Sequence, residues 1–312
     1  MVKKDLIKKD SKESKQSKVS KEPKESKEET EIIDISKIKE WDPSTVVEHY
    51  AAIFLAKRRS GKSELLKNML YIHNKQKRFD VAYLFSGTSD YQESIYDYIP
   101  KSNRHNFYDE GFIDNLVKNQ KQLAKDILEE KNPRLKKKLQ NILIILDDCI
   151  DDSNIRNSSV LDSLFTLGRH LHISVIVLSQ SISSKCGIKK VQMDNSDLIV
   201  TFLVFGDYDR KIITDKYMSL FDDKKYARSL LNSITLEKQY QCIVLETYKT
   251  YITDMEMYVR KSCLPLCKKK FMIGTDVIQA SEIPYTKGGR ETNVVIKDIT
   301  PESDEFMRLT IY

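Results

Sequence analysis

The sequence predicts an α/β fold in which helices flank a mostly parallel central sheet, with an antiparallel hairpin at one edge. From residue 50 onward, short apolar runs alternate with helix-length amphipathic segments. The runs are nearly continuous in Val, Ile, Leu and Phe, as is typical of parallel strands that are covered on both faces. Strands that alternate with helices imply right-handed crossovers and a parallel sheet.

The expected strands share this apolar character, and they cover residues 50–55, 81–85, 142–146, 174–178 and 198–204. The amphipathic segments between them predict helices at residues 63–75, 111–130 and 159–170 and a helical stretch after Asp207. Further on, residues 235–260 hold two β-rich runs with a short link at 247–249. This pattern predicts the antiparallel edge hairpin.

The length of 312 residues suits one α/β domain with tails. Residues 1–30 are near-repeats of Lys, Ser and Glu with almost no apolar side chain, which predicts a disordered tail. We expect the folded domain at residues 31–274 and a weakly patterned C-terminal extension at residues 275–312.

Composition excludes several classes of protein. No apolar run of about 18 residues exists, and the N-terminus lacks the apolar stretch of a signal peptide. The five cysteines are odd in number, which predicts free thiols, and no second pair or nearby His completes a zinc site at Cys263 and Cys267. A net charge of +6 is compatible with a polyanionic partner but indicates one only weakly.

The segment AKRRSGKS, residues 56–63, follows an apolar strand and opens an amphipathic helix, as a phosphate-binding loop requires. Gly61 allows the backbone to approach a phosphate, and successive amides at a helix N-terminus bind anions. We expect Lys62 to reach the β- and γ-phosphates and the Ser63 hydroxyl to ligate Mg²⁺. The expected cofactor-binding residues are Ala56, Lys57, Arg58, Arg59, Ser60, Gly61, Lys62 and Ser63.

Two further strands end in polar side chains. In the segment NILIILDDC, an apolar strand ends in Asp147 and Asp148, and we expect this strand to lie next to the loop-bearing strand. Asp147 is the expected Mg²⁺ ligand, and Asp148 can polarise an attacking water. SVIVLSQ ends in Gln180, whose amide can sense the γ-phosphate or the water. In the sequence, one strand lies between the loop and the acidic strand, and another strand, which ends in Gln180, follows. This order of strands points to the additional-strand class of P-loop ATPases.

Taken together, AKRRSGKS, ILIILDDC and LFTLGRHLHISVIVLSQS resemble the genome-packaging ATPases of nucleocytoplasmic large DNA viruses, of the poxvirus type. These belong to the FtsK/HerA superfamily of DNA-pumping motors, and the resemblance covers about residues 40–260. It implies a RecA-like P-loop NTPase fold, ATP and Mg²⁺ as cofactors, and a homo-oligomeric ring that threads double-stranded DNA into a capsid.

The resemblance also implies catalytic roles for Asp148, Gln180 and Arg169. Arg169 matches the Arg-His position of the family, which implies contact with the γ-phosphate or with a neighbouring subunit. The chain departs from the family pattern at Ala56, where a Gly is usual, and at Met193, where relatives tend to carry Arg. If the family's arginine finger lies at that second place, Arg169 or Arg210 must serve instead.

The resemblance implies further partners and a location. Capsid proteins or membrane-associated vertex proteins are expected partners, no metal other than Mg²⁺ is expected, and the expected location is the viral factory in the host cytoplasm or the virion. Residues 185–190 and 268–270 are basic segments that could face DNA or be ordinary solvated charge. Three alternatives stay open: a cellular or plasmid translocase of the same superfamily, a non-hydrolysing assembly scaffold, and a nucleotide kinase, although no Arg-rich lid is visible.

Overall fold

A computed structural model describes residues 34–36, 38–88, 95–129, 139–149, 155, 157–180, 188–204, 206–219, 221–249, 259–262 and 267–274. The expected tail at residues 1–30 and the expected extension at residues 275–312 lie outside the described residues, so these domain limits stay predictions. The first half of the basic segment 185–190 lies outside them as well.

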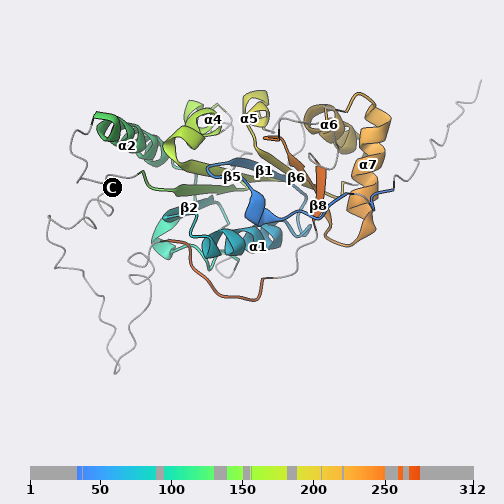
Figure 1. The fold of residues 1–312 in the computed structure, drawn as a ribbon, viewed down its shortest axis with the longest axis horizontal. Coiled ribbons are helices and arrows are strands. Elements are labelled where there is room, and N and C mark those ends of the chain that lie inside the picture. Colours follow the sequence, from blue (N-terminus) through green and yellow to red (C-terminus); the bar gives the residue numbers. More distant parts are fainter. Residues whose placement is uncertain are drawn as a thin grey trace, which may run out of the picture. The chain divides into compact units, whose positions relative to one another are not determined.

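One eight-stranded sheet organises the domain, with the strand order β3-β2-β4-β5-β1-β6-β7-β8 (Figure 1). Its strands are β1 (Ala51–Leu55), β2 (Val81–Ser86), β3 (Arg104–His105), β4 (Ile142–Asp147), β5 (Ile173–Ser179), β6 (Leu198–Phe202), β7 (Cys242–Glu246) and β8 (Val259–Ser262). The strands β1 to β6 are parallel to one another, whereas β7 pairs antiparallel with both β6 and β8. The expected fold class is therefore confirmed.

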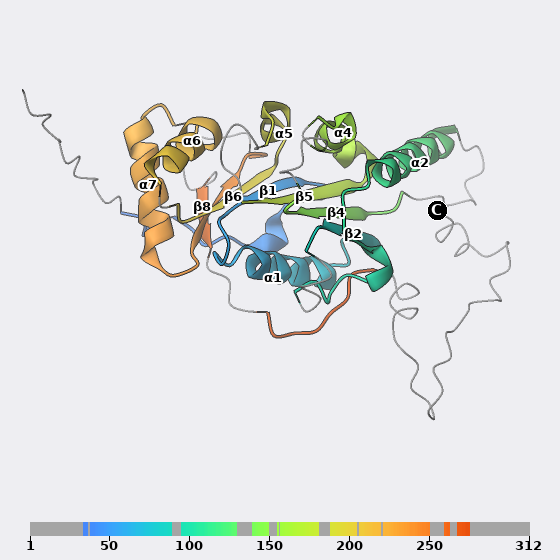
Figure 2. The ribbon, with the colours of Figure 1, turned by 180° about the vertical axis from the view of Figure 1, so that it is seen from behind.

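The two faces of the sheet are covered by different helices. Figures 1 and 2 show α1 (Lys62–Lys75) on one face and α2 (Glu110–Glu129), α4 (Ser159–Leu167), α5 (Lys190–Asp194) and α6 (Asp207–Tyr217) on the other. The helix α7 (Lys224–Glu237) packs its apolar residues into the same core as α2 and α4. Short 3-10 helices lie at η1 (Pro43–Thr45), η3 (Lys101–Asn103) and η4 (Gly168–Leu171).

Strand β1 shows why the apolar runs are continuous. Ile53 and Leu55 belong to the core beneath α2, α4 and α7, whereas Ala52 and Phe54 belong to the core beneath α1. Successive side chains of a strand point to opposite faces, and both faces of this strand are buried. All five residues of β1 are accordingly buried.

The structure corrects several expectations about individual elements. Strand β5 lies between β1 and β4, so the acidic strand is not next to the loop-bearing strand. The helix expected at residues 159–170 ends at Leu167 and continues as η4. The helical stretch expected after Asp207 is confirmed, and it consists of two helices, α6 and α7. Strand β3 and the short helix α5 were not expected.

The edge hairpin has the expected antiparallel pairing but a different connection. Strand β8 begins at Val259, so the connection from β7 is longer than the expected link at residues 247–249. Among the described residues, we find no helix that has both the length and the apolar character needed to cross a membrane.

Candidate functional site

The candidate site lies at the C-terminal ends of the central parallel strands. The chain leaves β1 at Leu55, turns through residues 56–61 and enters α1 at Lys62. The amide of Ala56 donates to the carbonyl of Ser179 at 3.1 Å, which ties the start of this loop to the end of β5. Gly61 has a φ of 94°, a conformation that a residue with a side chain rarely adopts. The loop thus delivers Lys62 and Ser63 at a helix N-terminus.

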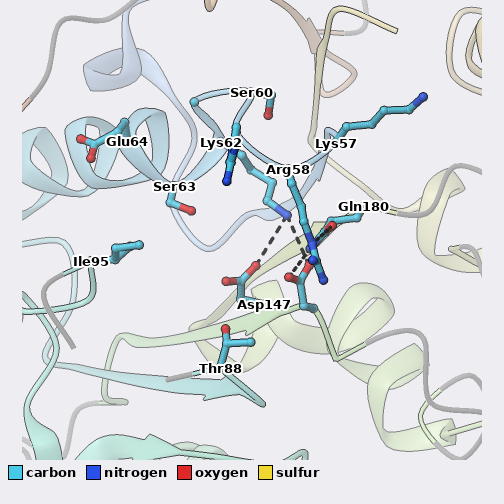
Figure 3. Close-up of a pocket in the computed structure, with 13 residues that line it drawn as sticks. Lys57, Arg58, Ser60, Lys62, Ser63, Glu64, Thr88, Ile95, Asp147 and Gln180 are labelled. Carbon is cyan, nitrogen blue, oxygen red and sulfur yellow. Dashed lines mark hydrogen bonds and ion pairs between the residues drawn. The ribbon is translucent and has the colours of Figure 1, made fainter. Parts of the chain in front are cut away.

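A cavity of about 490 Å³ opens beside this loop (Figure 3). Its walls bring together nearly all of the expected site residues: Lys57, Arg58, Arg59, Ser60, Gly61, Lys62, Ser63, Asp147, Asp148 and Gln180, together with Glu64, Thr88 and Ile95. Ala56 is buried at the end of β1 and does not line the cavity.

The Lys62 ammonium lies between two carboxylates from the end of β4. Its Nζ is 3.6 Å from Asp147 Oδ1 and 3.5 Å from Asp148 Oδ1, and only 9% of its side chain is exposed. Among the described residues, no hydrogen bond reaches Lys62 Nζ, Asp147 Oδ1 or the buried Ser60 hydroxyl. Buried polar atoms are usually hydrogen-bonded, so a cluster of three such atoms in one cavity indicates a site for a polar ligand.

Tyr96 is a site residue that the sequence did not reveal. Its buried hydroxyl donates a hydrogen bond to Asp147 Oδ2 and also interacts with Ser63. Burial raises the pKa of the Asp147 carboxyl, while the Lys62 ammonium and the Tyr96 hydrogen bond act in the opposite direction. Tyr96 lies in an irregular segment after β2, where no motif marks it, so only the folded structure could place it.

A second chain of contacts joins the loop to the acidic strand. The Arg58 Nε donates to Gln180 Oε1 at 3.1 Å, and the Gln180 amide nitrogen donates to Asp148 Oδ2. Asp148 has a φ of 53°, which is uncommon for a residue with a side chain and is often found at functional sites. A continuous polar series therefore crosses the cavity, from Arg58 through Gln180 and Asp148 to Lys62.

The structure places Arg169 at the other end of β5 from Gln180. It lies in η4, before β5 begins, and lines a separate polar hollow that also contains Asp197. Arg210, the other candidate finger, contacts Asp207 and Asn232 through its guanidinium. Neither arginine lines the cavity beside Lys62. Either one would therefore have to act on the corresponding cavity of a neighbouring subunit, and this role stays a prediction.

The arrangement combines an anion-binding loop with acidic and amide groups. Backbone amides at a helix N-terminus and an adjacent ammonium bind phosphate groups. Carboxylate and hydroxyl oxygens, here from Asp147 and Ser63, are the ligands that a hard divalent cation prefers. Asp148 and Gln180 can orient a water molecule beside these groups.

A known protein family matches most of the expected domain. The family model described as "Poxvirus A32 protein" matches residues 42–264. Protein 088R of Invertebrate iridescent virus 3, described as uncharacterized, is 27% identical over 197 residues, which are 63% of this chain and 69% of that protein. Protein 075L of Invertebrate iridescent virus 6, also described as uncharacterized, is 26% identical over 190 residues, with coverage of 55% and 69%.

Solved structures with similar folds were found as well. The genome packaging NTPase B204 from Sulfolobus turreted icosahedral virus 2, in complex with ATP-gammaS, is 15% identical with a TM-score of 0.46. The match covers 73% of this chain and all of that one. The pCW3 conjugation coupling protein TcpA, with ATPgS, is 14% identical with a TM-score of 0.49, and the match covers 72% and 68%.

Proposed function

The chain belongs to the poxvirus A32 protein family, and we propose that it hydrolyses ATP to move double-stranded DNA during packaging of a viral genome. The family match confirms the resemblance to poxvirus-type packaging ATPases. The proposal rests on one observation: the Lys62 ammonium is buried between Asp147 and Asp148, directly after the 56–61 loop. This is where a triphosphate would meet both a phosphate-binding lysine and a pair of carboxylates.

In this proposal, each group of residues has one task. The amides of residues 57–62 and the Lys62 ammonium bind the phosphates of ATP. On binding, the γ-phosphate would take the place beside Lys62 that the carboxylates hold. Asp148 orients the attacking water, and Gln180 holds Asp148 through its amide nitrogen. Fixed positions of this kind are the main contribution of protein groups to phosphoryl transfer.

The residues around Asp147 fit a Mg²⁺ ion. The Ser63 hydroxyl and the Asp147 carboxylate would hold it, and Asp147 Oδ1 is a buried oxygen without a hydrogen bond from the described residues. Mg²⁺ would supply charge to neutralise the phosphate oxygens. The Tyr96 hydroxyl fixes the other carboxylate oxygen and so orients Asp147.

The proposed partners follow from the family. We propose a homo-oligomeric ring around double-stranded DNA, with Arg169 of one subunit acting on the site of the next and with capsid or membrane-associated vertex proteins as further partners. In our proposal the protein works in the viral factory in the host cytoplasm or in the virion. DNA contacts would be made to phosphates and would not depend on base sequence.

Steady-state ATP hydrolysis, measured with and without linear double-stranded DNA, tests this function. We expect DNA to stimulate hydrolysis and Lys62→Ala to abolish it, because the variant lacks the ammonium that contacts the phosphates. Lys118→Ala is the matched control, since Lys118 is an exposed residue of α2 that pairs with Asp114 outside the site. This control should behave as the wild-type protein does.

The outcomes separate the open alternatives. Binding of ATP with no turnover in either condition would contradict the motor and support an assembly scaffold. Turnover that Lys62→Ala leaves intact would contradict the assignment of the phosphate site itself. Phosphate transfer to a nucleotide acceptor in place of water would support a kinase.

A further inference from the structure

We propose that the turn between α7 and β7 forms the subsite for the base of the nucleotide, with the Tyr240 ring as the stacking platform. This inference rests on the proposed function, because it concerns the same nucleotide. It assigns a binding place to the base of the nucleotide, which the phosphate-binding residues do not contact. It concerns a second cavity, which lies beside the same 56–61 loop.

The second cavity has a volume of about 280 Å³ and adjoins the first one. The two share the loop residues Lys57, Arg58, Arg59 and Ser60, so a ligand whose phosphates bind at Lys62 can extend along the loop into it. The walls of the second cavity beyond the loop come from the end of β6, the end of α7 and the following turn. Asp147, Asp148 and Gln180 do not line it.

The sheet topology explains why this turn reaches the loop. Strand β7 runs antiparallel to β6, and its first residue, Cys242, pairs with Phe202 at the end of β6. The turn that precedes β7 therefore lies at the same edge of the sheet as the C-terminal ends of the parallel strands. That edge also carries the loop after β1.

Tyr240 lies directly against the phosphate-binding loop and is still open to solvent. A Cβ added at Gly61 would lie 3.4 Å from both Cβ and Cδ1 of Tyr240, which is ordinary contact distance. Even so, 56% of Tyr240 is exposed, and neighbouring Leu236 is 63% exposed. Exposed aromatic and aliphatic side chains beside a polar phosphate site offer an apolar surface for a flat ring.

The backbone and the polar lining of the turn support the same assignment. Tyr240 has a φ of 63°, an outlying conformation for a bulky residue, and it is held there by the hydrogen bond from the Gln241 amide to the Lys238 carbonyl. Gln241 lines the cavity and donates its side-chain Nε2 to Glu237 at 2.5 Å. Its Oε1 receives no hydrogen bond from the described residues, so it is an acceptor suited to an amino or imino group of a base.

Nucleotide binding by the full chain, measured by calorimetry with ATP and separately with inorganic triphosphate, tests the proposal. We expect Tyr240→Ala to weaken ATP binding about tenfold, because the binding free energy from stacking a base on an aromatic ring corresponds to about that change in affinity. Binding of inorganic triphosphate should be unchanged, and Tyr240→Phe should retain ATP affinity. The matched control is Tyr208→Ala, because Tyr208 is 65% exposed and lines neither cavity.

Each other result has a distinct meaning. Equal weakening of ATP and triphosphate by Tyr240→Ala would show that Tyr240 supports the loop, which overturns the base subsite and leaves the phosphate site standing. Unchanged ATP affinity with a loss of DNA-stimulated turnover would assign this basic, aromatic surface to nucleic acid and would also overturn the proposal. Failure of the wild-type protein to bind either ligand would refute the proposed function, and this inference with it.

Discussion

Arg58 is the residue of the loop whose side chain has a defined partner across the cavity. Its Nε donates to Gln180, and Gln180 donates to Asp148, the carboxylate that we propose orients water. An exposed arginine at the tip of a phosphate-binding loop can act in two ways. It can supply charge to the phosphates, or it can fix the amide that in turn fixes the carboxylate.

The two roles of Arg58 are separable by substitution. We expect Arg58→Ala to lower the kcat of ATP hydrolysis about tenfold while the affinity for ATP changes less, because a misplaced general base mainly affects the chemical step. Arg58→Lys keeps the positive charge but lacks the Nε donor, so it should be impaired to a similar extent. Steady-state kinetics together with nucleotide binding measure both effects. Full activity of Arg58→Lys would show that charge, and not the contact with Gln180, is what matters.

At the residue scale, local motifs allowed most of the site to be predicted. Lys62, Asp147, Asp148 and Gln180 each follow an apolar strand or open a helix, and parallel strands bring their C-terminal ends to one edge. Tyr96, and Tyr240 of the proposed base subsite, have no such signal. They come from irregular connections whose course depends on packing, so no spacing in the sequence links them to the loop.

The connection from α4 to β5 is the element that holds Arg169, and a glycine determines how closely it packs. A Cβ added at Gly168 would lie 2.8 Å from the backbone carbonyl oxygen of Ile173, closer than real Cβ atoms approach such an oxygen. The 3-10 turn η4 therefore lies against the first residue of β5 only because residue 168 has no side chain.

Substitution of Gly168 should consequently destabilise the protein. We expect Gly168→Ala to reduce the free energy of unfolding by about 1–3 kcal/mol, the typical cost of forcing an extra methyl group into a packed region. Gly111→Ala is the matched control, because a Cβ there meets only the Asp109 carboxylate oxygen at 3.5 Å and alanine favours the helix. Urea unfolding of both variants measures the difference. Equal stability of the two variants would contradict the packing argument.

At the element scale, the predictions succeeded where the chain is buried on both faces. The five apolar runs became β1, β2, β4, β5 and β6 within one or two residues at each end. Strand β3 is two half-buried residues, Arg104 and His105, and has no apolar run to reveal it. The order of the strands in space was the harder problem, because nothing local in the sequence indicates that β5 inserts between β1 and β4.

Across the whole molecule, residues 38–50 connect the far edge of the sheet to the helix that carries the site. The amide of Trp41 donates to the carbonyl of Lys261 in β8 at 2.8 Å. A few residues later, the carbonyl of Pro43 lies 2.9 Å from His73 Nε2, near the end of α1. Since a carbonyl can only accept, His73 donates from Nε2 and its Nδ1 accepts from the Tyr50 hydroxyl at 3.1 Å. One buried, neutral imidazole thus joins the lead-in segment, β1 and α1.

This imidazole makes the stability of the domain dependent on pH. Burial lowers the pKa of His73 from 6.5 to about 4, and the nearby Arg78 guanidinium acts in the same direction. The folded state keeps His73 neutral while the unfolded state takes up a proton below pH 6.5, so unfolding is favoured as the pH falls. The stabilisation is therefore complete above about pH 6.5 and is lost progressively towards pH 4. Between pH 7.5 and pH 5, we expect a loss of about 2 kcal/mol in the free energy of unfolding from this group.

Comparison with a variant isolates the contribution of His73 from that of the other titrating groups. His73→Gln should be less stable than the wild-type protein at pH 7.5, because Gln cannot reproduce both hydrogen bonds, and the gap should narrow by about 2 kcal/mol at pH 5. Urea unfolding at a series of pH values measures these differences. A difference in the free energy of unfolding between His73→Gln and wild type that stays constant across this pH range would contradict the prediction. It would show that the imidazole is protonated alike in the folded and unfolded states, so that the link between α1 and the lead-in segment does not depend on a neutral histidine.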